Sequence, residues 1–215
     1  MLFTVRNQDG GAPWSTVEDV TFRNNVVRHT AAGINILGRD DIRRSAPARR
    51  IAIRNNLFAD VGGPRWGGTG ALLQILNGAA QVVVEHNTAL QTGSILVAEG
   101  APNEGFVFRA NVLPHNEYGM IGTGTAPGSA TIARFFPDAV IEGNVIAGGD
   151  AARYPRGNHF PASLAGVGFA DQGRGDYRLA EASRYRNGTA GREPGVDMAA
   201  LAAAGALKAG EGAPR

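Results

Sequence analysis

Residues 20–27 read VTFRNNVV, and this pattern of residue types recurs four more times along the chain. Apolar residues take the first and third positions, an asparagine takes the sixth, and an apolar residue takes the eighth. The further copies are IAIRNNLF at 51–58, VVVEHNTA at 82–89, FVFRANVL at 106–113 and AVIEGNVI at 139–146. The shared asparagines, separated by 31, 31, 24 and 33 residues, are Asn25, Asn56, Asn87, Asn111 and Asn144.

Each copy begins with the alternation of apolar and polar residues that is typical of a β-strand, as at Val20 and Phe22. The bias toward β-branched and aromatic residues agrees with this interpretation. We expect the strand to bend at the asparagine, because asparagine tolerates left-handed backbone angles and hydrogen-bonds to neighbouring amides. If the units stack in register, equivalent asparagines lie about 4.8 Å apart and satisfy one another. The repeat therefore predicts a structural asparagine ladder at one corner.

A second run of strand-forming residues occurs once per unit, in LFTVR, GINILG, ALLQILNG, SILVAEG and YGMIGTG. Units of 24 to 33 residues with two or three short strands are the size of one coil of a solenoid, and the unequal spacing predicts loops of different length. The sequence therefore predicts an all-β fold, a right-handed parallel β-helix. An antiparallel sandwich is the alternative that short strands leave open.

Two regions follow from this repeat. Residues 1–150 are predicted to form the coils, and 151–215 a loop-rich C-terminal cap packed on the last coil. Asp197 is a good N-cap for a short terminal α-helix in MAALAAAGALK. At the other end Met1 already falls inside a strand-like segment, so we expect N-terminal coils of the parent chain to be missing.

The composition narrows the classes of partner. The chain has 215 residues, a formal net charge of +2 and scattered arginines, which does not favour a nucleic-acid partner. It has no cysteine, so disulfides and cysteine-based zinc sites are excluded, and no firm metal site is predicted. No apolar segment is long enough to suggest a membrane span, and no signal peptide is visible.

The repeat and the tail together resemble bacterial right-handed β-helix repeat proteins of the pectate-lyase-like superfamily. The tail residues that carry the likeness are Asp176-Tyr177-Arg178-Leu179, Gly188-Thr189, Gly191 and Pro194-Gly195-Val196-Asp197. The resemblance spans nearly the whole chain and implies a polysaccharide partner, often acidic, and an extracellular or periplasmic location. The Asn-Thr-Asp and Gly-His-Gly signatures of polygalacturonases are absent. Lys208 is the only lysine, so a lyase would need an arginine or histidine base.

Charged and polar residues gather just after the second strand of successive units, which places them on one edge of the predicted stack. The candidate catalytic residues are Asp9, Arg39, Asp40, Asp41 and Glu99. The candidate substrate-binding residues are Trp14, Arg43 and Arg44 at this edge, Asn35 and Gln74 on the second strands themselves, and Trp66 in a Gly/Pro-rich loop.

Two chemistries fit such a set. β-Elimination on a uronate needs a base that removes a proton next to the substrate carboxylate. It also needs that carboxylate neutralised, either by an arginine or by a calcium ion held on oxygen ligands. Hydrolysis needs two carboxylates instead, such as Asp9 with Asp40 or Asp40 with Glu99. The sequence therefore predicts a lyase- or hydrolase-like protein acting on uronate-containing glycans. The alternative is a non-catalytic glycan-binding or surface-structural protein, in which Asp40-Asp41 and Arg43-Arg44 form a local ion-pair cluster.

Overall fold

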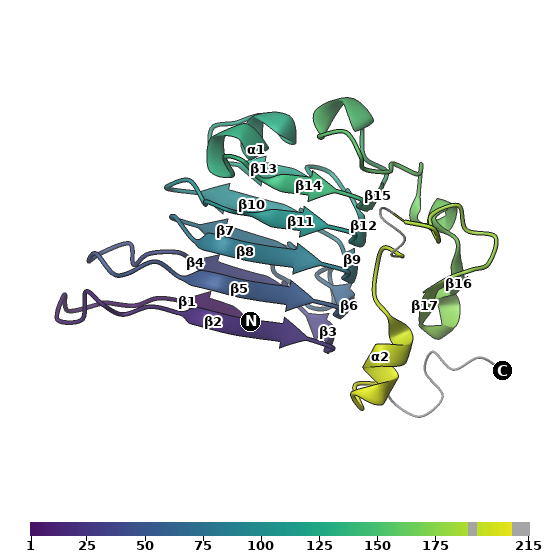
Figure 1. Ribbon diagram of the computed structural model, residues 1–215, viewed down its shortest axis with the longest axis horizontal. Coiled ribbons are helices and arrows are strands. Elements are labelled where there is room, and N and C mark those ends of the chain that lie inside the picture. Colours follow the sequence, from purple (N-terminus) through teal and green to yellow (C-terminus); the bar gives the residue numbers. More distant parts are fainter. Residues whose placement is uncertain (189–192, 208–215) are drawn as a thin grey trace.

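The computed structural model describes residues 1–188 and 193–207, and three parallel sheets of five strands each dominate it (Figure 1). Thr189, Gly191 and Lys208, which the sequence analysis singled out, lie outside the described residues. Sheet A consists of β1 (Leu2–Thr4), β4 (Ile34–Leu37), β7 (Leu73–Leu76), β10 (Leu96–Glu99) and β13 (Met120–Gly122). Sheet B consists of β2 (Glu18–Arg23), β5 (Arg49–Arg54), β8 (Ala80–Glu85), β11 (Val107–Arg109) and β14 (Val140–Glu142). Sheet C consists of β3 (Val26–Thr30), β6 (Leu57–Val61), β9 (Thr88–Gln91), β12 (Val112–Pro114) and β15 (Val145–Ala147).

The chain visits the three sheets in turn, so that one strand of each makes a coil and every coil stacks on the one before. Phe22 pairs with Ile53 in the next coil, and Ile53 pairs with Val84, all in parallel register. This arrangement confirms the predicted parallel β-helix solenoid and excludes the antiparallel sandwich for these three sheets. The sequence indicated two strands clearly, whereas the structure has three, because a separate strand of sheet C starts directly after each asparagine.

The corner between sheets B and C, hereafter the B–C edge, is a turn of two residues in every coil. Its first residue carries the left-handed backbone, with φ of 55° at Asn24, 51° at Asn55 and 53° at His86. The repeated asparagine is the second residue and has no positive φ. The expectation that the strand bends at the asparagine itself is therefore wrong by one residue, and the asparagine is placed for its side chain rather than its backbone.

The predicted asparagine ladder is confirmed. The backbone N–H and the side-chain Nδ2 of Asn56 both donate to Oδ1 of Asn87, at 3.0 Å each, and Nδ2 also donates downward to the carbonyl of Phe22. The same pattern holds between Asn87 and Asn111 and between Asn111 and Asn144. Asn56, Asn87, Asn111 and Asn144 are at most 1% exposed, so these four rungs form a buried and mutually satisfied network.

The ladder has a further rung that the sequence analysis missed. Asn144 donates through N and Nδ2 to Oδ1 of Asn158, and the chain beyond it adds to sheet C, with the Ile146 N–H donating to the His159 carbonyl. The signal was present in the sequence, since Gly157-Asn158-His159-Phe160 matches Gly143-Asn144-Val145-Ile146 in type. The absence of an alternating strand before Asn158 hid it.

The core fills the space between the three sheets, and alternate residues of each strand point into it. The stack of Ile53, Val84, Phe108 and Ile141 in sheet B is at most 3% exposed. Helix α1 (Ser129–Phe135) lies in the connection between β13 and β14 and contributes Ile132 and Phe135 to the same core (Figure 1). The interior is therefore closed to ligands, which leaves the outer edges for function.

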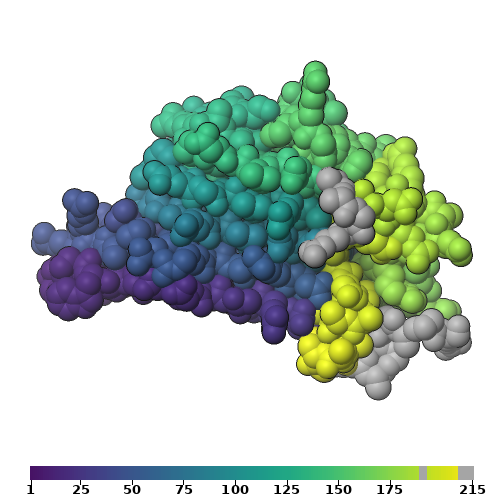
Figure 2. All heavy atoms as spheres, in the orientation of Figure 1, coloured from purple at the N-terminus to yellow at the C-terminus, as the bar shows by residue number. Residues whose placement is uncertain are grey.

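Within residues 151–188 and 193–207, the C-terminal segment contains three short 3₁₀ helices, an antiparallel strand pair and one α-helix, and it lies along the side of the stack (Figure 2). Its elements are η1 (Ala151–Arg153), η2 (Leu164–Val167), β16 (Phe169–Asp171), η3 (Gln172–Arg174), β17 (Asp176–Leu179) and α2 (Met198–Ala203). The predicted N-cap of α2 is confirmed, because the Asp197 carboxylate accepts from the N–H groups of Ala199 and Ala200.

The position of α2 differs from the expectation. Met198 and Leu201 pack against Leu57 and Ala59 of β6, in the second coil, and not over the last coil. The residues between Leu164 and Tyr185 instead pack against Val112 and Val145 of the last two coils. The tail thus runs back along sheet C, because the outer face of that sheet is apolar and needs cover.

Candidate functional site

Loops of unequal length leave sheet A for sheet B, and this corner, hereafter the A–B edge, carries most of the predicted site residues. The connections span residues 5–17, 38–48, 77–79, 100–106 and 123–139. The first two project from the stack as adjacent loops (Figures 1 and 2). Asp9 and Trp14 lie in the first loop and Arg39 to Arg44 in the second. Sequence reasoning therefore placed these residues on one edge correctly.

Hydrogen bonds tie the two long loops together. The Asn7 side chain donates to the Arg44 carbonyl at 2.8 Å and accepts from the Ala12 N–H at 2.7 Å. Thr16 donates its hydroxyl proton to the Pro47 carbonyl at 2.7 Å. The two loops consequently form one surface feature.

Asp40 is the anchor of this feature. Its carboxylate accepts the backbone N–H groups of Asn7 at 2.8 Å, Ile42 at 2.8 Å and Arg43 at 3.0 Å, and the residue is 7% exposed. The hydrogen bonds from the Arg43, Asn7 and Ile42 amides, in that order, lower the pKa of Asp40 from 3.8 to about 2. A carboxylate with this pKa and with both oxygens engaged is a poor proton acceptor, so the geometry assigns Asp40 to holding the loops.

The side chains around Asp40 form an open hollow of about 440 Å³. Its lining residues are Arg39, Asp40, Asp41, Ile42, Arg43, Arg44 and Asn77. Arg39 donates to the Ser45 carbonyl, and Asn77 donates to the Arg39 carbonyl. Arg43 and Arg44 are exposed, and no ion pair engages either guanidinium within the described part of the chain. The hollow therefore presents two free positive charges.

The other predicted site residues lie in three different parts of the stack. Glu99 ends β10 at the same A–B edge, where its carbonyl accepts from the Asn77 N–H. Asn35 and Gln74 pair side by side on the outer face of sheet A, with Asn35 Nδ2 donating to Gln74 Oε1. Trp66 lies in the connection 62–72 between sheets C and A, so it does not join Trp14 and Asp40.

Trp66 instead belongs to a cluster that sequence reasoning did not find. Its Nε1 donates to Oδ2 of Asp60 at 2.7 Å, and the same oxygen lies 2.7 Å from Nδ1 of His29. The His29 and Trp66 rings are 5.1 Å apart, and the Arg65 guanidinium lies 4.8 Å from the Trp66 ring centre. The bond to His29, followed by that to Trp66, lowers the pKa of Asp60. The carboxylate thus orients the imidazole of a side chain that is 57% exposed.

This cluster depends on register rather than on local sequence. His29 in β3 and Asp60 in β6 are 31 residues apart, and both have a positive φ, 58° and 55°. Equivalent bulged positions in adjacent coils turn both side chains to the outside. The repeat spacing of 31 between Asn25 and Asn56 is the signal that could have paired them.

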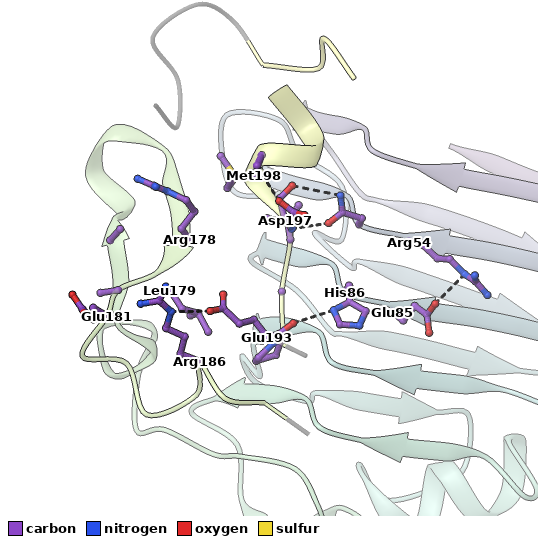
Figure 3. A pocket seen from close by; sticks show the side chains of 17 residues that line it. Arg54, Glu85, His86, Arg178, Leu179, Glu181, Arg186, Glu193, Asp197 and Met198 are labelled. Atoms are coloured by element: carbon purple, nitrogen blue, oxygen red, sulfur yellow. Dashed lines mark hydrogen bonds and ion pairs between the residues drawn. The ribbon is translucent and has the colours of Figure 1, made fainter. Parts of the chain in front are cut away.

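A pocket of about 770 Å³ lies at the B–C edge, between the stack and the C-terminal segment (Figure 3). Its charged groups are largely paired with one another: Arg54 with Glu85 at 3.1 Å and Arg186 with Glu193 at 2.9 Å. His86 Nδ1 lies 3.0 Å from the Glu193 carbonyl oxygen. The first pair lies within the stack and the second within the tail, whereas the His86–Glu193 contact and the Asp197 N–H, which donates to Asn55 Oδ1, hold the tail against the stack.

The chain matched no protein-family model, no curated protein and no solved structure. Within residues 1–188 and 193–207, no three His, Asp or Glu side chains are grouped so as to hold a metal ion. No helix among the described residues is long and apolar enough to cross a membrane. The site is therefore interpreted from its own geometry.

The role of Asp40 predicts an acid-dependent loss of stability. Because its pKa is lower in the folded than in the unfolded chain, Asp40 stabilises the fold above about pH 4 and loses this effect as the pH falls to about 2. Asp40→Asn should therefore lower the urea midpoint at pH 7, and the difference from the unmodified protein should vanish near pH 2. Asp41→Asn, at the exposed neighbouring carboxylate, is the control and should change the midpoint little. Equal effects of the two substitutions would contradict this role.

Proposed function

We propose that the chain binds acidic, uronate-containing polysaccharides along its A–B edge without transforming them there. The observation that carries this proposal is the hollow in which Arg43 and Arg44 are free while the nearby Asp40 is engaged by backbone amides. Of the two predicted classes, this favours the glycan-binding protein over a hydrolase or lyase centred on Asp40.

The chemistry of the edge suits a linear acidic polymer. Arginine pairs with carboxylates through two parallel hydrogen bonds, which gives orientation as well as attraction. Trp14 is 73% exposed in the loop that is tied to the hollow, and an exposed indole can stack on a sugar ring. Because the core is filled, a polymer has to lie along the outside of the stack, and the two projecting loops supply a wall.

Calcium does not fit this hollow. The ion takes six to eight oxygen ligands. The Asp40 oxygens already accept three N–H groups, and Asp41 Oδ1 lies 3.4 Å from the Asn77 Nδ2 donor.

Three finer features of the architecture are part of the same proposal. The coils are right-handed, which parallel crossover connections favour in nearly all cases. Of the predicted cap 151–215, residues 151–188 act as the C-terminal cap, and we propose that the chain is a member of the pectate-lyase-like superfamily. Proteins of that kind meet polysaccharides outside the cytoplasm, so we place this one in the extracellular or periplasmic space, on fold-level analogy.

The binding proposal predicts a charge-specific loss. The double substitution Arg43→Gln and Arg44→Gln should weaken binding of polygalacturonate about tenfold or more, because two guanidinium–carboxylate pairs are lost. Isothermal titration at low and at moderate salt would measure it. The control is Arg153→Gln with Arg174→Gln, which removes the same charge from surface pairs elsewhere. Equal affinity losses in both double variants would show only a general charge effect and would contradict the proposal.

An enzymatic function is the second candidate, and the His29–Asp60–Trp66 cluster favours it. Nδ1 of His29 is fixed by Asp60, so Nε2 is free to take a proton from the uronate carbon next to the carboxylate. The electron pair of the broken carbon–hydrogen bond then forms a double bond to the neighbouring carbon, the bond from that carbon to the glycosidic oxygen breaks, and the oxygen takes a proton from water. Arg65 is the group that would neutralise the substrate carboxylate, and Trp66 would stack on the sugar.

This candidate predicts formation of an unsaturated product, followed by its ultraviolet absorbance over a panel of uronate polymers. His29→Asn should reduce the rate about a hundredfold or more, because general-base catalysis contributes at least that much. Asp60→Asn should reduce it less and alter its pH profile, since it only misorients the imidazole. His159→Asn, on another part of the surface, should have no effect. Absence of product, or a rate unchanged by His29→Asn, would remove the enzymatic candidate.

A further inference from the structure

The charge of the A–B edge changes from coil to coil. The connection 38–48, in the second coil, carries three arginines and two aspartates and is net positive. The connection 77–79, in the third coil, carries no charged residue. The fourth coil places two carboxylates at this edge, Glu99 at the end of β10 and Glu104 in the connection 100–106. Along the stack axis the edge is therefore basic, then neutral, then acidic.

These three coils lie in close contact at the edge. The Asn77 N–H donates to the Glu99 carbonyl at 2.9 Å, and the Asn77 side chain donates to the Arg39 carbonyl at 3.1 Å. A side-chain carbon added at Gly78 would lie 3.7 Å from Nε of Arg39 and 3.6 Å from Cβ of Ala101. The short third connection thus leaves the basic and the acidic coil only two strand spacings apart, about 10 Å.

The two glutamates of the fourth coil point their charge at solvent. Glu99 and Glu104 are both exposed, and neither forms an ion pair within residues 1–188 and 193–207. The backbone around Glu104 is fixed, because its carbonyl accepts from the Gln81 N–H at 2.8 Å. The edge therefore presents two uncompensated carboxylates next to the neutral coil.

This order of charges bears on which acidic polymer the edge can hold. A polymer that lies along the edge passes one coil about every 4.8 Å, which is close to the length of one sugar residue. A uronate beside the second coil meets Arg43 and Arg44. A second uronate two residues further along meets Glu99 and Glu104 instead, and like charges in such proximity repel.

We infer that the A–B edge selects acidic glycans whose uronate residues are separated by uncharged residues, and that Glu99 and Glu104 determine this specificity. The inference rests on the proposed binding of acidic polysaccharides at this edge. A polymer with a carboxylate on every residue gains the arginine contacts and also meets the repulsion. A glycan with an uncharged residue at the fourth coil keeps the arginine contacts, and its hydroxyl groups can donate to the two glutamates.

Two probes with the same backbone test this specificity: polygalacturonate with every carboxylate free, and polygalacturonate partly converted to its uncharged methyl ester. Isothermal titration of the whole chain at low salt gives the ratio of the two affinities. Glu99→Gln with Glu104→Gln should shift this ratio about threefold or more toward the fully charged polymer, because two exposed like-charge contacts are lost. The shift should shrink at high salt, where exposed charges are screened.

The matched control is Glu142→Gln with Glu181→Gln, which removes two exposed carboxylates away from the A–B edge and should leave the ratio unchanged. An unchanged ratio in the Glu99 and Glu104 variant, or an equal shift in the control, would overturn the specificity while both polymers still bind, and the proposed function would stand. Failure of the unmodified chain to bind either polymer would overturn the proposed function, and this inference with it.

Discussion

The side-chain amide of one buried asparagine per coil is the interaction on which the rest of the structure depends. A buried amide has two donors and an acceptor that need partners, and an isolated one would be costly. Stacking solves this, because each Oδ1 receives two N–H groups from the rung below and each Nδ2 also reaches a carbonyl there. The B–C turn is accordingly two residues long in every coil, and the strands on both sides keep their register.

Because the B–C turn has the same length in every coil, differences in loop length fall at the other two corners. Between sheets A and B the connections range from three residues at 77–79 to seventeen at 123–139, and the core does not change. In the loops 5–17 and 38–48, the Asp40 carboxylate supplies acceptors for three backbone amides. The same logic places His29 and Asp60 together at equivalent bulges of adjacent coils. Function in such a fold is a property of edges, where residues distant in sequence become neighbours through register.

The features that could be predicted from the sequence are those that the repeat determines. The parallel stack and the ladder followed from the recurring asparagine, and the common edge of Asp9, Arg39 and Glu99 followed from their position after equivalent strands. The sequence could not show that the Asp40 carboxylate is engaged, because its partners are backbone amides that carry no residue signature. Nor could it place α2 on β6, since an apolar helix face fits any apolar surface. The sequence also left the position of Trp66 open, because a tryptophan in a Gly/Pro-rich loop does not reveal which corner the loop occupies.

The central claim is that the ladder holds the stack together, and its most direct measurement compares two rungs by chemical denaturation. Asn87→Ala removes a fully buried rung, the acceptor of two N–H groups of Asn56 and the donor to the Ile53 carbonyl. The free energy of unfolding should fall by about 2–4 kcal/mol. Asn25→Ala, at the half-buried end rung, should cost less than about 1 kcal/mol. Equal losses for both, or a loss below about 0.5 kcal/mol for Asn87→Ala, would show that strand pairing and core packing hold the stack without the ladder.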